Sequence, residues 1–370
     1  MRLYLKQNVW DAALDRIRWL YDEFDHVQVC FSGGKDSTVL ANLTVQVARE
    51  KGRLPVPLLF IDQEFEWQAA IEYVRRTMHR EEFEPRWVQT LITSSKHIIS
   101  GRGTGKVQHC WTPGGPWTRE KEQDSLKLDF GTTDFFQIMA GSLSHFYPEG
   151  RACNLGGVRG AESSGRIRAV TSDVTYKGVT WGKIIDRKKH YYDFYPLYDW
   201  SVRDVWKAIG DNGWDYCELY DRMFQQGYSL DDMRISDLYS STSVRHLQRL
   251  AELEPETWER IVGAIEGASA LSHLQEQFTT AKELPEVFVD WVEYRDYLLE
   301  HLVPKEDWLL YQKRFAAYEA RFGINDSLTR YMVNSILVGD REGTRLRNWA
   351  SEFDFYAKNA RTRRNPLWKK

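Results

Sequence analysis

The stretch Val27-Gln-Val-Cys-Phe-Ser-Gly-Gly-Lys-Asp-Ser-Thr-Val-Leu40 decides the fold of this 370-residue chain. Its first five residues, 27–31, are mostly apolar and predict a buried strand. Apolar residues then recur at helical spacing from Val39 to Val47, which predicts a helix. A turn of small residues at 32–34 joins the two, so we expect a strand, a tight turn and a helix in direct succession.

The small residues of this turn point to anion binding. Without bulky side chains the backbone can approach a ligand closely, and its N–H groups can point inward. A helix N-terminus directly behind such a turn favours anions, phosphate above all, and Lys35 adds a positive charge at the mouth. The predicted phosphate-binding residues are consecutive: Ser32, Gly33, Gly34, Lys35, Asp36 and Ser37.

This loop is not the commoner phosphate loop, which needs Gly, four residues and then Gly-Lys-Ser/Thr. Val29 stands where the first Gly should be, and Asp36 stands where the hydroxyl should be. Ser32-Gly-Gly-Lys-Asp-Ser37 instead resembles the PP-loop of the ATP-pyrophosphatase and phosphoadenylylsulfate (PAPS) reductase superfamily. The resemblance implies a loop that holds pyrophosphate, chemistry at the α-phosphate, and an α/β fold: a Rossmann-like adenine nucleotide alpha-hydrolase sheet with helices on both faces.

Two later stretches resemble the same superfamily. Ala152-Cys-Asn-Leu-Gly-Gly-Val-Arg-Gly-Ala-Glu-Ser-Ser-Gly-Arg166 reads as a short strand that ends in glycines and is followed by arginines, which can bind phosphate bidentately. The stretch 195–222 resembles the Pro-Leu-x-Asp-Trp…Asp-Val-Trp…Leu-Tyr-Asp pattern. The resemblance places Arg159 at the phosphate or sulfate end of the nucleotide, with a surface pair to Glu162 as the alternative. The nucleotide-binding residues predicted here are Gly157, Arg159 and Arg166.

A second predicted strand, 55–61, ends at Asp62-Gln-Glu64. Ligands of open α/β sheets collect at the carboxyl ends of strands, so Asp62 and Glu64 are predicted to bind nucleotide. The resemblance also gives an acidic residue here a nucleotide contact, and the alternative is an N-cap carboxylate on the next helix. Asp36 and Asp62 are the predicted Mg²⁺ ligands.

The remaining sequence suggests two domains. A third strand is expected at 87–92. Over 93–133 the residues show no pattern typical of a strand or helix, so we expect an insertion there that forms a lid or a partner surface. A β-hairpin is expected at 173–186, and helices follow from residue 243. We therefore predict a nucleotide-binding domain at 1–240 and a helical domain at 241–370.

Composition narrows the functional class. Lysine and arginine number 50 against 53 acidic residues, a net charge of −3, so no global field attracts nucleic acid or membrane. The basic tail 358–370 reads as a solvated segment, with nucleic-acid contact as the alternative. No run of ~18 apolar residues occurs, and the four cysteines form no disulfide framework, so a cytoplasmic protein without a membrane span is expected. His109 and Cys110 lack companions at metal-ligand spacing, so no zinc is expected.

The chain departs from the sulfonucleotide reductases. These enzymes carry a catalytic Glu-Cys-Gly motif near the C-terminus, whereas no cysteine follows Cys217, and the iron–sulfur cysteines of the adenylylsulfate reductases are missing too. A closer resemblance is to the PAPS reductase-like group that includes the immunoglobulin-binding regulator A proteins, named as PAPS sulfotransferase-like. That group shares the strand end at 62–64, a Cys-Trp…Pro…Trp-x-Arg insertion, seen here at 110–119, and a helical C-terminal extension. Its members often sit beside a ParB-like protein.

The first functional hypothesis is an enzyme that uses ATP or a related adenine nucleotide. The loop amides and Lys35 would hold the β- and γ-phosphates, Asp36 with Asp62 would place Mg²⁺, and Arg159 would stabilise charge at the α-phosphate. The catalytic residues are then Lys35, Asp36 and Arg159, and the products are pyrophosphate with AMP or an adenylated acceptor. A sulfur-transfer or nucleic-acid-linked accessory pathway would use such a reaction.

Two alternatives keep the same pocket. In one, the ligand is PAPS and an external thiol completes sulfuryl transfer or reduction. In the other, the chain is a nucleotide-sensing subunit that works with a ParB-like or other DNA-binding partner.

Overall fold

The computed structural model describes most of the chain as two compact units. The described residues are 6–93, 109–115, 117–171, 174–235, 238, 244–264, 281 and 283–363. Unit 1 consists of Met1–Ser94, His109–Tyr239 and Arg249–Ile265, and unit 2 of Ser95–Gln108, Ser240–Gln248 and Glu266–Lys370. The division of the chain at residue 240 into a nucleotide-binding and a helical domain stays a proposal.

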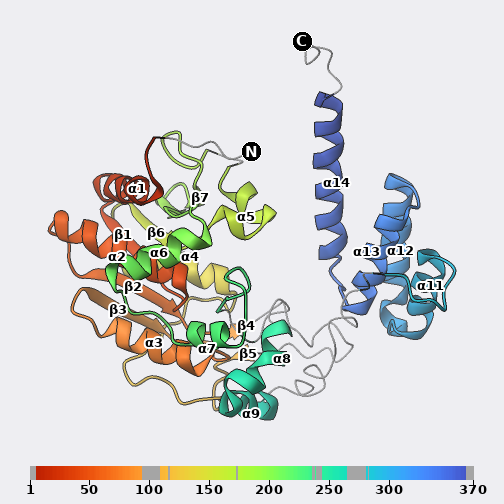
Figure 1. Ribbon diagram of the computed structural model, residues 1–370, viewed down its shortest axis with the longest axis horizontal. Helices are drawn as coiled ribbons and strands as arrows, with labels where there is room; N and C mark the ends of the chain where they lie inside the picture. The colour runs from red at the N-terminus through yellow and green to blue at the C-terminus, as the bar shows by residue number, and fades with distance from the viewer. Residues whose placement is uncertain are drawn as a thin grey trace. The chain divides into compact units, whose positions relative to one another are not determined.

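Unit 1 is built on a six-stranded sheet with the order β3-β2-β1-β6-β8-β7 (Figure 1). The first five strands in this order run parallel, and β7 is antiparallel to β8. The strand order reverses between β1 and β6, so their carboxyl ends border the crevice in which open α/β sheets bind ligands. The strands are β1 (His26–Cys30), β2 (Val56–Ile61), β3 (Phe83–Val88), β6 (Ala152–Gly156), β7 (Gly182–Asp186) and β8 (Tyr191–Phe194).

Helices cover both faces of this sheet. Val27 and Val29 of β1 point to one face and Gln28 to the other, and all three are buried. The predicted α/β fold with helices on both faces is thereby confirmed. The helices of unit 1 are α1 (Val9–Glu23), α2 (Lys35–Glu50), α3 (Gln68–Met78), α4 (Phe135–Phe146), α5 (Ser164–Ala169), α6 (Val202–Asn212), α7 (Leu219–Gln225) and α9 (Pro255–Ala264), with α8 (Val244–Leu253) leading into α9.

A row of buried polar side chains crosses the sheet from β3 to β8. Arg86 donates to Gln28 Oε1 at 2.7 Å, Gln28 donates to Asn154 Oδ1 at 2.9 Å, and Asn154 donates to Asp193 Oδ1 at 3.0 Å. Burial raises the pKa of Asp193 to about 6. Because each member has a partner, the row fixes the relative register of four strands without orphaned polar atoms.

Two predicted elements lie elsewhere than expected. The third strand is β3 at Phe83–Val88, earlier than 87–92, and Ile92–Thr93 is a separate strand, β4, which pairs antiparallel with β5 (His109–Cys110). Pro85 obscures β3 in the sequence, but an edge strand tolerates proline. Of the hairpin predicted at 173–186, an antiparallel bridge between Tyr176 and Val179 is present, whereas β7 pairs with the later β8.

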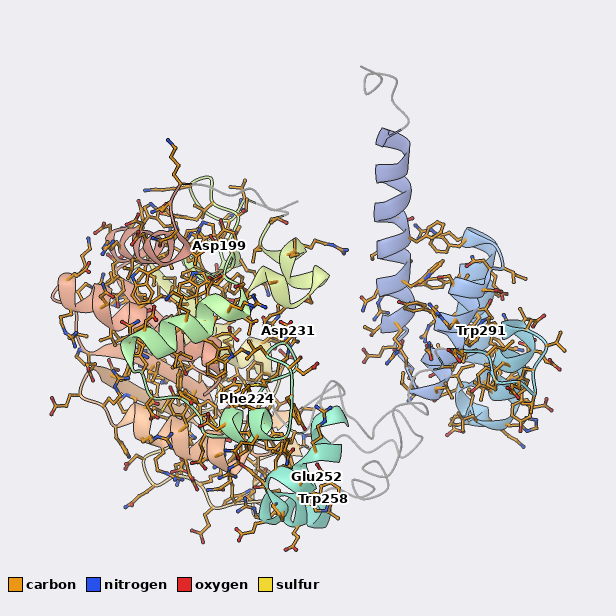
Figure 2. The ribbon with its side chains drawn as sticks, viewed as in Figure 1. Asp199, Phe224, Asp231, Glu252, Trp258 and Trp291 are labelled. Atoms are coloured by element: carbon orange, nitrogen blue, oxygen red, sulfur yellow. The ribbon has the colours of Figure 1, made fainter. Side chains whose placement is uncertain are left out.

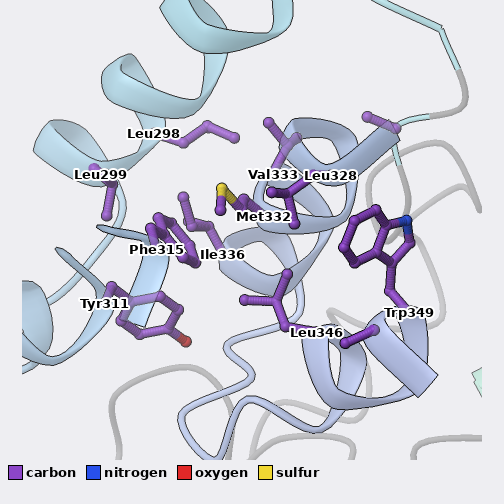
Figure 3. Packing of buried hydrophobic residues seen from close by; sticks show 12 residues of the cluster. Leu298, Leu299, Tyr311, Phe315, Leu328, Met332, Val333, Ile336, Leu346 and Trp349 are labelled. Carbon is purple, nitrogen blue, oxygen red and sulfur yellow. The ribbon is translucent and has the colours of Figure 1, made fainter. Parts of the chain in front are cut away.

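Unit 2 is helical, as predicted, and has its own core (Figure 3). Its helices α11 (Trp291–His301), α12 (Lys305–Phe322), α13 (Asp326–Leu337) and α14 (Thr344–Arg363) follow in chain order. Asp290 and Asn325 cap α11 and α13 by accepting from backbone amides of the first turn. Fully or largely buried residues make the core, among them Leu298, Tyr311, Phe315, Leu328, Met332, Val333, Leu346 and Trp349. In the parts of the chain that the structure describes, no helix is long and apolar enough to cross a membrane.

Candidate functional site

The loop between β1 and α2 has the backbone that its glycines permit. Gly33 has φ +71°, and a Cβ added there would lie 3.0 Å from Cγ2 of Val74. For both reasons, a larger residue at position 33 would strain the loop. Gly34 then occupies the N-cap of α2, which begins at Lys35. The predicted strand, turn and helix are therefore present in this order.

The amides of this loop are largely uncommitted. The Lys35 amide donates to the hydroxyl of Tyr220 at 3.0 Å, and the Ser32 amide donates to Oγ of Ser37 at 3.3 Å. Among the residues that the structure describes, no acceptor pairs with the amides of Gly33, Gly34, Asp36 and Ser37. Free amides at the start of a 16-residue helix form an anion-binding site, because they add to the positive end of the helix dipole.

The loop after β6 lies against this helix start. A Cβ added to Gly157 would lie 2.9 Å from the backbone nitrogen of Ser37 and 3.0 Å from the carbonyl carbon of Asp36. Only glycine permits so close an approach of two backbones. The approach brings the buried Arg159 to Asp36, whose Oδ1 pairs with the guanidinium Nε.

Lys35 is buried at the mouth of the loop. Its Nζ lies 3.3 Å from Oδ2 of Asp36 and donates to the carbonyl oxygen of Met233 at 3.2 Å. Burial lowers the pKa of Lys35; Asp36 opposes this shift, and the positive charges of Arg159 and Arg234 add to it. A buried ammonium surrounded by guanidinium groups is stabilised by any anion that enters.

Arg166 and Glu162 complete the charged cluster. Glu162 pairs with Arg166, and its Oε1 lies 3.6 Å from Nη2 of Arg159. The Arg159–Glu162 pair, the alternative weighed from the sequence, is therefore present together with the Arg159–Asp36 pair. The structure thus brings together eight predicted residues, Ser32, Gly33, Gly34, Lys35, Asp36, Ser37, Gly157 and Arg159, and links Arg166 to them through Glu162.

A cavity of about 360 Å³ lies next to the loop, at the carboxyl ends of β1 and β2. Its walls are mostly apolar, and Ser32, Gln63, Glu66 and Arg166 supply polar groups. A mostly apolar cavity with a few polar groups is typical of a small-molecule site. The apolar lining residues are Cys30, Phe31, Leu59, Phe60, Ile61, Phe135, Met139 and Ile235.

Asp62 lies at the end of β2 but is fully buried and engaged by protein donors. Oδ1 accepts from the amide of Glu64 at 2.8 Å, and Oδ2 accepts from Nε1 of Trp87 and Nε2 of Gln89, each at 2.8 Å. Arg119 also pairs with the carboxylate. Both oxygens are occupied, so this geometry favours a structural role for Asp62.

Glu64 forms hydrogen bonds with the part of the insertion that returns to the sheet. It adopts φ +66°, and its carboxylate accepts from the amides of Trp111 and Thr118, the latter at 2.8 Å. Burial raises its pKa, while these two hydrogen bonds and Arg119 oppose the shift. Asp62 and Glu64 thus hold Trp111, Thr118 and Arg119 of the insertion against the end of β2. The sequence predicted that these two carboxylates contact the nucleotide.

The alternative of an N-cap role for Asp62 on the next helix is wrong. The N-cap of α3 is Trp67, and Glu254 provides the carboxylate at this helix start. Its oxygens accept from the amides of Gln68 at 2.7 Å and Ala69 at 2.9 Å. The residue that satisfies the first turn of α3 is therefore 186 positions away in sequence from Gln68.

The predicted Mg²⁺ ligands Asp36 and Asp62 are each engaged by positively charged side chains. Asp36 pairs with Lys35 and Arg159, and Asp62 pairs with Arg119, so each carboxylate is already balanced by its own cations. Within the described parts of the chain, no group of three or more histidine, cysteine, aspartate or glutamate side chains could hold a metal ion. This donor set does not fit a Mg²⁺ ion shared by Asp36 and Asp62.

Sequence reasoning missed three contributors to the loop site. Tyr220 accepts from the first amide of α2, the Met233 carbonyl holds the Lys35 ammonium, and Arg234 adds positive charge. Tyr220 lies in the Leu-Tyr-Asp part of the stretch 195–222 that resembles the superfamily, so this resemblance could have indicated Tyr220 as a site residue. Gly101–Lys106 and the tail residues 364–370 lie outside the described residues, so nucleic-acid contact through the tail stays a prediction.

Comparison with known proteins agrees with the site geometry. A family model described as the phosphoadenosine phosphosulfate reductase domain matches residues 26–111 and 147–229. Over these two stretches, which make up a little under half of the chain, the protein matches the PAPS reductase-like superfamily. The matched residues of this superfamily domain contain the loop 32–37, Gly157, Arg159 and Tyr220, whereas Arg234 and the helices of unit 2 lie beyond them.

The individual relatives differ in how much of this chain, and of their own length, the match covers. The uncharacterised Escherichia coli protein YbdN is 28% identical over 86% of this chain and 80% of its own length. Sulfate adenylyltransferase subunit 2 of Vibrio vulnificus is 24% identical over 52% of this chain, and the match spans 59% of that protein. A solved PAPS reductase of Candida auris aligns over 64% of this chain and 98% of its own, with 13% identity and a TM-score of 0.33.

Proposed function

We propose that unit 1 binds ATP, or a related adenine nucleotide, and cleaves it at the α-phosphate to give pyrophosphate with AMP or an adenylated acceptor. The observation that carries the proposal is the set of uncommitted amides of Gly33, Gly34, Asp36 and Ser37 beside the buried Lys35 side chain. Consecutive amides, a helix N-terminus and an ammonium together match the charge and shape of a phosphate chain.

The neighbouring features supply the other parts of a nucleotide site. The cavity at the ends of β1 and β2 has the size and apolar lining that suit an adenosine group. The outer phosphates would bind the loop amides, and Arg159 would face the α-phosphate, where Gly157 places it. The remaining proposed nucleotide contacts are those of Ser32, Lys35, Asp36, Ser37 and Arg166.

The proposed reaction is an in-line displacement. An acceptor oxygen attacks the α-phosphorus, the bond to the bridging oxygen breaks, and pyrophosphate leaves with the electron pair. Lys35 and Arg159 stabilise the charge that develops on the phosphate oxygens, so most of the catalysis is electrostatic. The name of the Vibrio relatives supports chemistry at this phosphorus, because an adenylyltransferase transfers the adenylyl group.

A second candidate ligand is PAPS, which the description of the matching family model favours. An external thiol would then be required, since burial raises the pKa of Cys30, Cys153 and Cys217 and keeps these thiols protonated. Competition against bound labelled ATP separates the two ligands. PAPS displacing ATP far more strongly than ATP displaces PAPS would select the second candidate.

Product formation tests the proposed function. The purified chain is incubated with ATP and candidate acceptors, with and without Mg²⁺, and pyrophosphate and AMP are quantified. We expect release from the wild type and none from Lys35→Ala, while Lys207→Ala, which removes an exposed lysine paired with Asp211, behaves as wild type. Binding of ATP without release under any condition would contradict catalysis and favour a nucleotide-sensing subunit.

A further inference from the structure

We propose that Arg234 binds an anionic group of the nucleotide other than its 5′ α-phosphate. Such a group is either a distal phosphate of the 5′ chain or a phosphate on the 3′ oxygen. The inference rests on the proposed nucleotide site and adds to it a residue that lies outside the part matched by the family model. It also bears directly on whether the ligand is ATP or a 3′-phosphorylated nucleotide.

Arg234 belongs to the segment 229–235, which lies in the chain between α7 and α8 and contains Asp231, labelled in Figure 2. Its two sequence neighbours both touch the site. Met233 accepts the hydrogen bond of the Lys35 ammonium at 3.2 Å, and Ile235 lines the cavity of about 360 Å³. A residue between these two positions lies where the phosphate loop and the cavity meet.

The guanidinium of Arg234 is held by main-chain carbonyls. Its Nη2 donates to the carbonyl oxygen of Glu162 at 3.4 Å, and its Nε donates to that of Asp231 at 3.3 Å. Over the described residues, no carboxylate lies within ion-pair distance of it. Arg234 is exposed, so its charge is oriented by the backbone and open to a ligand.

The excess of positive charge in the cluster also supports binding of an anionic group by Arg234. Its cations are Lys35, Arg159, Arg166 and Arg234, and in the part of the chain that the structure describes, Asp36 and Glu162 are the carboxylates that pair with cations of this cluster. Arg234 contacts Glu162, the partner of Arg166, and follows Met233, the partner of Lys35; its positive charge also contributes to lowering the pKa values of Lys35 and Arg166. Four cations against two carboxylates favour a ligand with more than one negative group.

The test is calorimetric titration with three probes: ATP, adenosine 3′,5′-bisphosphate and AMP. Arg234→Gln removes the charge, Arg234→Lys keeps it without the planar fork, and Arg203→Gln removes an exposed arginine of α6 as a matched control. We expect Arg234→Gln to weaken ATP or the bisphosphate by about tenfold and AMP by less than about twofold. Arg234→Lys is expected to fall between, and Arg203→Gln to match wild type.

The probes also identify the source of the anionic group. A loss confined to ATP assigns Arg234 to the 5′ phosphate chain, and a loss confined to the bisphosphate assigns it to a 3′-phosphate. If Arg234→Gln lowers the affinity equally for all three probes, or lowers it for none of them, the inference is wrong. Because Arg234 is exposed, the thermal midpoint of the free protein should not change, and a lowered midpoint would assign Arg234 a structural role instead.

Failure of this inference is distinguishable from failure of the proposed function. If wild type binds ATP, Lys35→Ala does not, and Arg234→Gln binds as wild type, only the role of Arg234 is wrong. If wild type binds none of the three probes, both are wrong.

Discussion

The ends of β1 and β2 are neighbours in the sheet, yet their polar groups are used in opposite ways. At the end of β1, loop amides are uncommitted and Lys35 is buried beside further cations. At the end of β2, Asp62 and Glu64 are saturated by donors from within the chain: Trp87, Gln89, Trp111, Thr118 and Arg119. The polar groups after β1 are thus free to bind a ligand, whereas the two carboxylates after β2 are already occupied by donors of the chain itself.

This difference shows what a polar strand end can and cannot indicate. Position at the carboxyl edge of a parallel sheet is shared by both ends, so position alone does not separate a ligand site from a packing site. What separates them is whether another segment supplies the missing donors or acceptors. Four predictions test this contrast.

Asp62→Asn should have the largest effect, and the effect should be on stability. The change removes the fully buried counter-charge of Arg119, whose side chain is 10% exposed, and leaves the more distant Glu122 at 3.7 Å. Loss of one partner of a buried ion pair costs about 3 kcal/mol. Urea unfolding measures this loss, and ATP affinity of the folded variant should remain within about twofold of wild type. A stable variant that no longer binds ATP would contradict the structural role.

Arg159→Gln should have the next largest effect, on turnover. The amide side chain cannot stabilise charge at the α-phosphate, so pyrophosphate release should fall about 100-fold, with a smaller change in ATP affinity. Arg187→Gln, in the exposed turn between β7 and β8, is the matched control. Unchanged turnover in Arg159→Gln would exclude this residue from the reaction.

Gly157→Ala should have an intermediate effect on both properties. The new methyl group would meet the backbone of Asp36 and Ser37 at 2.9–3.2 Å, so the β6 loop must move away from α2. We expect a stability loss of about 1–2 kcal/mol and a weaker affinity for ATP. Gly210→Ala is the control, because nothing lies within 4 Å of its added Cβ in α6. Equal behaviour of the two variants would show that the close approach is dispensable.

The pH dependence of ATP affinity should be the smallest effect. Burial lowers the pKa of Lys35, and bound phosphate favours the protonated ammonium, so binding raises this pKa and takes up a proton. Affinity should therefore be highest below the pKa of the free protein and fall as the pH rises through it. Titrations from about pH 7 to about pH 10 measure this, and Lys35→Gln should remove the dependence. Affinity that rises with pH would have the wrong sign.

Local chemistry made much of the fold predictable. The loop 32–37 is set by its glycines, and the capping box of Ser201 with Asp204 at the start of α6 is present as the sequence indicates. Asp134, a residue type that commonly begins helices, is the N-cap of α4. Each of these features depends on residues within a few positions of one another.

The parts that could not be predicted depend on distant residues. Thr118 and Arg119 reach Glu64 and Asp62 across 54 and 57 positions. Glu254 caps α3 across a still longer separation. A single sequence contains the carboxylates but does not state which segment will supply their partners, so Asp62 and Glu64 resembled ligand contacts.

A crystal structure with the non-hydrolysable analogue α,β-methylene-ATP tests the central claim most directly. We expect phosphate density within hydrogen-bond distance of the amides of Gly33, Gly34, Asp36 and Ser37 and of the Lys35 ammonium, with the Asp62–Arg119 pair intact. Phosphate density at Asp62 and Glu64, with the loop amides unused, would contradict it.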